Sequence, residues 1–477
     1  MIDYTTKLTT HREFYPSSDL DWSVESDRGR IISSPAFRRL QKRTQVFALE
    51  LNAAVRSRLT HSLEVSQTAR FIAKTIVKKL NSKELKELEN AFTSTVEMAS
   101  LLHDIGNPPF GHFGETAINE WFTKKGLNYF QGIDGNSDLK DMLIKDLSSY
   151  DGNAQAIRIV HKLQRLNLSY TQTASIVKYT RGAFEDKTKD GDFSYLEKKP
   201  GFYYSEKEFV KTISDTLNIK PKHRFPLTYI MEAADDISYL SADIEDAVDK
   251  GILTLDSIYT LIKDECKVVN QKYNTNTTML FDIVDKNYKK AKSKEDEPYQ
   301  FNMFLTLTRA QLIFKLVDYV SDIYTNNHEA LFSGCFNNAL LEFDSQHECA
   351  QAVEVLQNIS VRHIYNNKQV QALELKGYRI IQGLFDLYEP LLSLNTNEFT
   401  NTIKNKKTNC LICKNLLARL SKKHLVAYKK SINDIKKDDL HNFELLEWYY
   451  RARLIIDYIS GMTDDYALEE YKSLSAI

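Results

Sequence analysis

The segment LLHDIGNPPFGHFGE, at residues 101–115, constrains the fold of this chain more than any other segment. Its two leucines end an apolar helical pattern, and His103 and Asp104 follow in the last turn. Gly106 is a residue type at which helices often end, and the two prolines after Asn107 keep the helix from resuming. We therefore expect a helix that ends by presenting an imidazole and a carboxylate side by side, which suits the binding of a cation.

Two further candidate ligands lie in helical segments far from this one. His61 is expected in the first turn of a helix capped by Thr60, because apolar residues recur every three or four positions after it. Asp235 lies in a segment with one apolar face that starts at Pro226 and ends before Gly251. Two histidines and two aspartates from three helices give a nitrogen and oxygen ligand set that suits magnesium, manganese, iron or zinc.

The spacing after Asp235 favours it over its neighbour Asp236 as the ligand. Asp235, Tyr239 and Asp243 recur every four residues, so they climb one face of a helix. Asp236 then points elsewhere, towards a helix terminus or a basic neighbour. The sequence therefore predicts a row of a carboxylate, a tyrosine and a second carboxylate that faces one site.

The second half of the opening segment supplies a candidate for proton transfer. His112 and Glu115 are one turn apart if the chain after Pro109 is helical, so their side chains can meet. A glutamate beside a histidine orients the ring and raises its pKa towards neutrality, which suits acid-base work. We expect this pair to be catalytic.

Segments along nearly the whole chain resemble one enzyme family. The order His, His-Asp, Asp is that of the HD superfamily of metal-dependent phosphohydrolases. The closest resemblance is to the bacterial deoxyguanosine triphosphate triphosphohydrolases (dGTPases), and it rests on residues 37–47, 52–65, 101–115, 151–160, 231–248, 377–394 and 447–471. The resemblance implies an enzyme that cleaves dGTP to deoxyguanosine and tripolyphosphate and so regulates dNTP pools.

The resemblance also implies a role for each candidate residue. It assigns a divalent metal, with Mg²⁺ or Mn²⁺ preferred over iron or zinc, to His61, His103, Asp104 and Asp235. Such an ion lowers the pKa of a bound water and polarises a phosphoryl oxygen.

The remaining implied roles concern the substrate. His112 would protonate the departing nucleoside oxygen or act as a nucleophile, with Glu115 supporting it. The implied substrate contacts are Arg58 and Asn107 at the phosphates, Gln45 and Asp243 at the 3′-hydroxyl, and Tyr239 against carbon 2′ of the sugar. Asn153 is a further phosphate candidate, Glu374 and Arg379 are base-facing candidates, and His161 could equally reach the phosphates or satisfy a helix interior.

Length and residue usage bound the architecture. The 477 residues would allow about three domains by length alone, yet ligands between residues 61 and 235 must close around one site. Glycine and proline are scarce, at 16 and 9 residues, and apolar spacing is mostly helical. We expect an all-α protein, with an HD-domain core and N-terminal extension at 1–260. A helical C-terminal portion at 261–477 would pack on the core and complete the nucleotide pocket.

Charge and cysteine content exclude several classes of protein. A net charge of −1 argues against a globally basic polyanion binder, although not against a local basic patch. With neither a signal sequence nor an apolar run of 18 residues, we expect a cytoplasmic location and no membrane partner. The charged stretch at 285–298 is expected to be an exposed loop. The five cysteines are an odd number, and Cys410 and Cys413 are interpreted as reduced thiols on a helix.

Partners and alternative functions follow from the same reasoning. The resemblance implies a homo-oligomer, a hexamer in the family, and a possible single-stranded DNA effector. One alternative is another HD enzyme, a nucleotide phosphatase or phosphodiesterase, against which the HFGE segment argues. The other is a DNA-responsive regulatory protein that binds nucleotide without turnover, for which a proton-transfer pair would be superfluous.

Overall fold

The structure is a computed structural model that describes residues 2–50, 52, 54–187, 191–294, 297–405, 410–438 and 442–476. It is 71 % helical. Among the described residues, the sheet structure is limited to two short parallel strands, β1 (Arg181–Gly182) and β2 (Pro200–Phe202), and one isolated bridge. The expected all-α class is therefore confirmed.

The first half of the chain forms twelve α-helices in the described residues. They are α1 (Leu20–Ile32), α2 (Pro35–Arg39), α3 (Arg58–Leu80), α4 (Lys83–Glu87), α5 (Glu89–Leu102), α6 (Gly111–Trp121), α7 (Asn128–Gln131), α8 (Ser137–Leu147), α9 (Gly152–Arg158), α10 (Tyr170–Ala174), α11 (Lys207–Thr216) and α12 (Pro226–Asp249). Short 3₁₀ or π-helical turns are η1 (Tyr4–Thr6), η2 (Leu40–Lys42), η3 (Phe122–Gly126), η4 (Ile159–Leu163) and η5 (Tyr204–Glu206).

The second half is helical throughout its described part. Its helices are α13 (Leu255–Tyr273), α14 (Met279–Lys292), α15 (Glu297–Asn326), α16 (His328–Ser333), α17 (Glu348–Ile359), η6 (Ser360–Tyr365), α18 (Lys368–Tyr388), α19 (Pro390–Ser393), α20 (Thr396–Ile403), α21 (Leu411–Arg419), α22 (Lys422–Asp438), α23 (Phe443–Ser460) and α24 (Asp464–Ser475).

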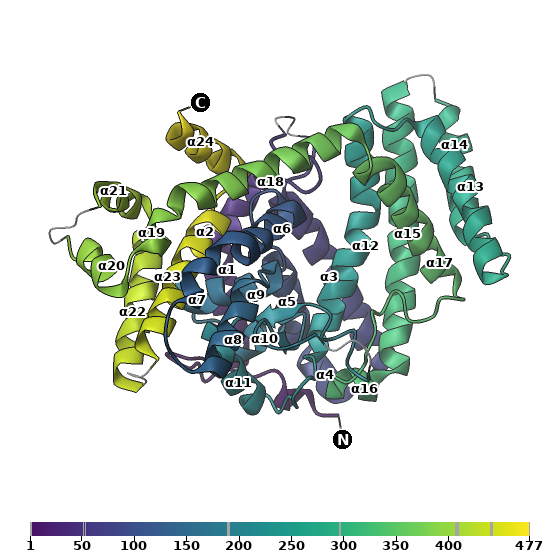
Figure 1. The fold of residues 1–477 in the computed structure, drawn as a ribbon. Coiled ribbons are helices and arrows are strands. Elements are labelled where there is room, and N and C mark those ends of the chain that lie inside the picture. Colours follow the sequence, from purple (N-terminus) through teal and green to yellow (C-terminus); the bar gives the residue numbers. More distant parts are fainter. Residues whose placement is uncertain are drawn as a thin grey trace.

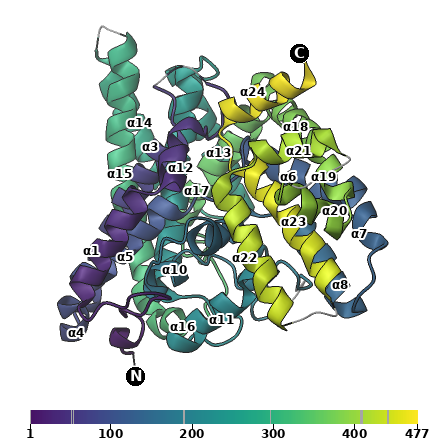
Figure 2. The ribbon, with the colours of Figure 1, turned by 90° about the vertical axis from the view of Figure 1, so that its left-hand side faces the viewer.

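These helices gather into two groups with a long helix between them. Figure 1 shows α13, α14, α15 and α17 at one end of the molecule and α20 to α23 at the other, with α18 crossing between the groups. The view in Figure 2 brings α22 and α23 to the front. Helices from both sides of residue 260 contribute to each of the two larger apolar cores. The division of the chain at residue 260 stays a prediction.

Three helices that carry site residues pack directly on one another. α3, α5 and α12 contact each other pairwise, and their apolar faces are buried in the largest core. Pro226 occupies the start of α12 and Gly251, with φ of +69°, follows its end, as expected. The expected cap of α3 is wrong by three residues. Because the helix starts at Arg58, Ser57 is the N-cap, and Thr60 Oγ1 accepts a hydrogen bond from the Ser57 backbone N–H.

Two local expectations in the second half are also wrong. The charged stretch expected as a loop continues α14 as far as Lys292, since Val284 and Ala291 give it a buried face seven residues apart. The part at 295–296 lies outside the described residues. Cys410 and Cys413 form a disulfide rather than two thiols on one helix. Cys410 is the N-cap of α21, outside the helix, which brings its sulfur next to Cys413.

Within the described residues, we find no helix that combines the length and the apolar character needed to cross a bilayer.

Candidate active site

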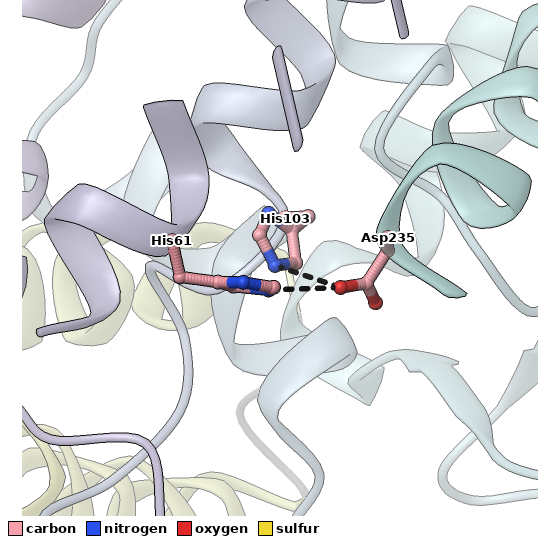
Figure 3. A group of neighbouring side chains, drawn as sticks. All are labelled: His61, His103 and Asp235. Atoms are coloured by element: carbon pink, nitrogen blue, oxygen red, sulfur yellow. Dashed lines mark hydrogen bonds and ion pairs between the residues drawn. The ribbon is translucent and has the colours of Figure 1, made fainter. Parts of the chain in front are cut away.

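Three of the expected metal ligands meet in one cluster. His61 comes from the first turn of α3, His103 from the end of α5 and Asp235 from the middle of α12. Asp235 Oδ1 lies 3.1 Å from His61 Nε2 and 3.5 Å from His103 Nε2. Figure 3 shows the two imidazole rings and the carboxylate turned towards a common point. One ligand atom from each residue lies within 4.8 Å of the others, so the donor set fits a single borderline or hard divalent ion.

Asp104 lies beside this cluster but outside it. Its Oδ1 is 3.6 Å from His103 Nε2 and accepts a hydrogen bond from Asn107 Nδ2 at 2.5 Å. Its Oδ2 accepts a hydrogen bond from Arg58 Nη1 at 2.6 Å. Asp104 is therefore adjacent to the metal position, and Arg58 and Asn107 both hold its carboxylate in place.

The local electrostatics favour ionised carboxylates at this point. Burial alone would raise the pKa of Asp235, but His103, His61 and Lys178 outweigh it and lower that pKa. Burial is likewise outweighed at Asp104, where Arg58 and then His103 lower the pKa to about 2. Burial would lower the pKa of His61, yet the hydrogen bond and charge of Asp235 raise it. Two aspartates kept negative beside two imidazoles form a site prepared for a cation.

The cluster opens into a cavity of about 500 Å³. Ten of the eleven predicted site residues line it: Gln45, Arg58, His61, His103, Asp104, Asn107, His112, Asp235, Tyr239 and Asp243. Glu115 is the exception, since it contacts the cavity only through His112. The volume lies in the range typical of small-molecule sites.

The row on α12 is held by residues from the second half of the chain. Tyr239 Oη accepts a hydrogen bond from Gln357 Nε2 at 2.7 Å, and Asp243 accepts one from the hydroxyl of Tyr365. Burial raises the pKa of Asp243 to about 6, although the Tyr365 hydrogen bond opposes the rise. Tyr365 lines the same cavity. Residues of the C-terminal half therefore contribute to this wall.

His112 and Glu115 meet as the helical spacing predicts. Both lie in the first two turns of α6, and His112 Nδ1 is 2.9 Å from Glu115 Oε2. The imidazole is 80 % exposed, whereas the glutamate is 13 % exposed. Glu115 Oε1 accepts a second hydrogen bond, at 2.8 Å, from the backbone N–H of Gly152 at the start of α9. A fixed carboxylate thus orients a solvent-accessible ring that lines the cavity.

Several cavity residues carried no signal in the sequence analysis. Lys178 and Lys199 line the cavity, and Lys178 Nζ lies 4.0 Å from Asp235 Oδ2. Both lysines stand alone in segments without a recognisable pattern, so only the fold could reveal them. Asn153 and Glu374 also line the cavity, whereas Arg379 is not among its lining residues.

The remaining open candidate, His161, lies outside this cavity. Its ring stacks on Phe209, with centroids 3.7 Å apart, and lines a separate cavity. Asp236, for which a helix terminus or a basic neighbour was expected, is buried and interacts with the positive charge of Lys178. Burial raises its pKa to about 8, with Lys178 opposing the rise.

Residues near the C-terminus fix the loop that follows His103 and Asp104. The Arg43 guanidinium, fully buried, donates to the carbonyls of Asn107, Ser460 and Met462. Asp464 accepts hydrogen bonds from Thr44 and from the backbone N–H of Phe110 at 3.1 Å. Segments more than 350 residues apart in the sequence are thereby joined next to the cavity.

Comparisons with known proteins agree with this geometry. The HD domain family model matches residues 58–179, and the phosphohydrolase-associated domain model matches residues 427–473. Proteins named deoxyguanosinetriphosphate triphosphohydrolase are similar over 100 % of this chain and 99 % of their own length. They include those of Klebsiella pneumoniae, 42 % identical, and of Enterobacter sp. (strain 638) and Yersinia pestis, both 43 % identical. The chain therefore belongs to the deoxyguanosinetriphosphate triphosphohydrolase family of HD-domain hydrolases.

Proposed function

We propose that this protein hydrolyses dGTP at the α-phosphorus, releasing deoxyguanosine and tripolyphosphate. The observation that carries the proposal is one cavity of about 500 Å³ in which a His/Asp cluster adjoins the tyrosine and carboxylate row of α12. The full-length similarity to enzymes named for dGTP supports it. Another type of HD phosphohydrolase would need the His/Asp cluster but not the Tyr239 and Asp243 side chains of α12. A protein that only binds nucleotide would not need the His112–Glu115 pair.

The metal would be held by His61, His103 and Asp235, with Asp104 completing the set. HD-domain hydrolases depend on a divalent ion, and we propose Mg²⁺ or Mn²⁺, with iron or zinc also compatible with these donors. When bound, such an ion supplies charge stabilisation at a phosphoryl oxygen and favours ionisation of water.

Cations around the cluster would bind the triphosphate. Arg58 lines the cavity and is kept in place by Asp104. Lys178 and Lys199 line the same cavity, and Asn107 and Asn153 add amide groups. Fixed positive charge of this kind stabilises the additional negative charge that develops on the phosphoryl oxygens in the transition state.

His112 would manage the proton. Because the Glu115 carboxylate can only accept, His112 Nδ1–H donates to it and leaves Nε2 for the cavity. As water adds to the α-phosphorus, the bond from phosphorus to O5′ breaks, and a proton from protonated Nε2 would convert that oxygen to the nucleoside hydroxyl. The alternative is attack by Nε2 itself on phosphorus, with water later cleaving the phosphoenzyme.

Selectivity for the deoxy sugar would come from the α12 row. Asp243 and Gln45 would hydrogen-bond the 3′-hydroxyl, and Tyr239 would pack against carbon 2′, where a ribose hydroxyl would collide with its ring. Glu374, on the same cavity, is our candidate for a contact to the base. A buried wall fixed by Gln357 and Tyr365 cannot readily move aside.

The assembly and its effector are further parts of the proposal. Family resemblance favours a homo-oligomer, a hexamer, and activation or inhibition by single-stranded DNA. Light scattering coupled to size-exclusion chromatography tests the first, and turnover with added oligonucleotide tests the second.

Product analysis tests the reaction itself. Each dNTP and GTP is incubated with the protein and Mg²⁺ or Mn²⁺, and the products are separated by anion exchange. We expect deoxyguanosine and tripolyphosphate from dGTP, little product from GTP, and none from the His103→Ala variant. Monophosphate with pyrophosphate would show that a different bond breaks, and equal turnover by the variant would place the chemistry elsewhere.

A further inference from the structure

A second cavity, of about 320 Å³, lies between η4 and α22, apart from the catalytic one. None of its lining residues lines the catalytic cavity. Helix α22 lies on the near face of the molecule in Figure 2.

The lining of this second cavity, called the basic cavity below, carries a clear excess of positive charge. Five cations contribute to it: Lys162, Arg165, Lys422, Lys423 and Lys430. The acids that face them are Glu13 and Asp434. Within the described parts of the chain, none of the five cations forms an ion pair or a side-chain hydrogen bond, although Arg165 lies over the Phe14 ring, 4.9 Å from its centroid. Many other lysines and arginines of the protein are paired. Such a cluster repels itself until an anion binds.

The basic cavity is also lined by a buried, stacked histidine and by apolar side chains. The side chain of His161 is 8 % exposed, stacks on Phe209 and has an Nδ1 atom without a hydrogen-bond partner among the described residues. Its Nε2 lies 3.5 Å from Glu13. Leu163, Ala427 and Val426 supply apolar surface, and the last of these is 63 % exposed. The site therefore offers both charge and a surface for an organic group.

We propose that the basic cavity binds the oligophosphate group of a small molecule. Lysines from two separate helical elements converge on one concave space, so a ligand with several charges contacts more of them than a single-charge anion can. Lys162 is part of this cluster, and burial, with Arg158 and Lys430, lowers its pKa against the opposing charges of Glu206 and Glu13; a bound anion would raise it. A space of this size encloses a small ligand, whereas a nucleic-acid strand follows an extended groove lined with stacking platforms.

The basic cavity has a direct structural connection to the catalytic one. Helix α9 continues into η4, so Gly152 to Leu163 form one helical run. Asn153, at its start, lines the catalytic cavity, and His161, eight residues later, lines the basic cavity. A ligand bound there would be an effector positioned roughly 12 Å along one helix from the active site. The binding itself is independent of the proposed reaction.

The test measures where an oligophosphate protects lysines. The full-length protein is acetylated at low reagent concentration, with and without inorganic tripolyphosphate, and each lysine is quantified by mass spectrometry. We expect slower acetylation of Lys162, Lys423 and Lys430. Lys178 and Lys199 report the catalytic cavity separately in the same sample, and Lys429, exposed on α22 but outside the lining, is the internal reference.

Matched variants then distinguish binding of tripolyphosphate in the cavity from nonspecific electrostatic attraction to the lysines of α22. Lys423→Gln with Lys430→Gln should abolish protection of Lys162 and weaken tripolyphosphate binding to this cavity by about tenfold or more. The control Lys429→Gln removes a charge from the same helix and should change neither. All three residues are exposed, so the variants should keep the melting temperature of the parent.

Three results would overturn the proposal. Protection confined to Lys178 and Lys199 would assign all binding to the catalytic cavity. Equal effects of Lys429→Gln would show a diffuse field rather than a site. Protection by a single-stranded oligonucleotide, but not by tripolyphosphate, would make this face a nucleic-acid surface. If the unmodified protein did not hydrolyse dGTP, only the proposed function would be contradicted, because the lysine-protection experiment does not depend on catalysis.

Discussion

The Glu115 carboxylate contacts both His112 and the backbone of Gly152, and two different substitutions can distinguish the effects of these contacts. One oxygen meets His112 Nδ1 at 2.9 Å, and the other accepts from the Gly152 N–H at 2.8 Å. Glu115→Ala removes both, leaving a half-buried backbone donor unsatisfied, which should cost about 1–3 kcal/mol of unfolding free energy. Glu115→Gln keeps an acceptor for Gly152 but presents an NH₂ group to His112, so the ring loses the partner that fixes its Nδ1–H tautomer.

The two variants should therefore differ in stability but agree in activity. We expect both to lose roughly a hundred- to ten-thousandfold in kcat for dGTP, the size of a general acid-base contribution. Only the alanine variant should also unfold at lower urea concentration. Steady-state kinetics and urea titration followed by circular dichroism measure the two effects. Full activity in Glu115→Gln would refute the orienting role, and equal destabilisation of both would refute the Gly152 contact.

Three further outcomes follow from contacts described above. Tyr239→Ala should raise the ratio of GTP to dGTP turnover, because the ring no longer fills the space at carbon 2′; Tyr239→Phe, which keeps the ring, should leave the ratio low. Asp457→Ala should cost about 3–5 kcal/mol of unfolding free energy in a urea titration, since it removes the nearer of the two carboxylates that pair with the buried Arg158, leaving only Glu206. The exposed Asp465→Ala is its control and should cost under about 1 kcal/mol. The KM for dGTP should rise as pH falls through about 6, the raised pKa of Asp243. Below that pH the carboxyl group is protonated and no longer offers a charged acceptor to the 3′-hydroxyl of the substrate. A pH-independent KM would contradict this, and Asp243→Asn should remove the dependence.

The sequence predicted best those residues whose positions follow from helical periodicity. His112 and Glu115 meet because a turn of helix separates them, and the α12 row faces one cavity because its members recur every four residues. The boundaries of α12 followed from Pro226 and Gly251. The start of α3 was harder to predict, since Ser57 and Thr60 are both good capping residues and only the backbone decides between them.

Residues brought to the site by long-range packing were beyond such reasoning. Lys178 follows no motif, and Tyr365 lies in a π-helical turn whose hydroxyl reaches Asp243 across 122 residues. The Cys410–Cys413 bond depends on Cys410 being the N-cap of α21 rather than a residue within the helix. The charged end of α14 was taken for a loop because its buried face consists of few residues. In each case the deciding contact is tertiary rather than local.

The tethering of the catalytic loop to residues near the C-terminus has a consequence for synthesis. A nascent chain emerges from the ribosome with His61, His103 and Asp235 long before Ser460, Met462 and Asp464. Until those last residues arrive, the Arg43 guanidinium lacks the Ser460 and Met462 carbonyls as acceptors, and the Phe110 N–H lacks the Asp464 carboxylate. A polypeptide released early would thus carry every metal ligand and still lack a finished loop. Synthesis of residues 460–464 therefore completes the contacts that hold the catalytic loop.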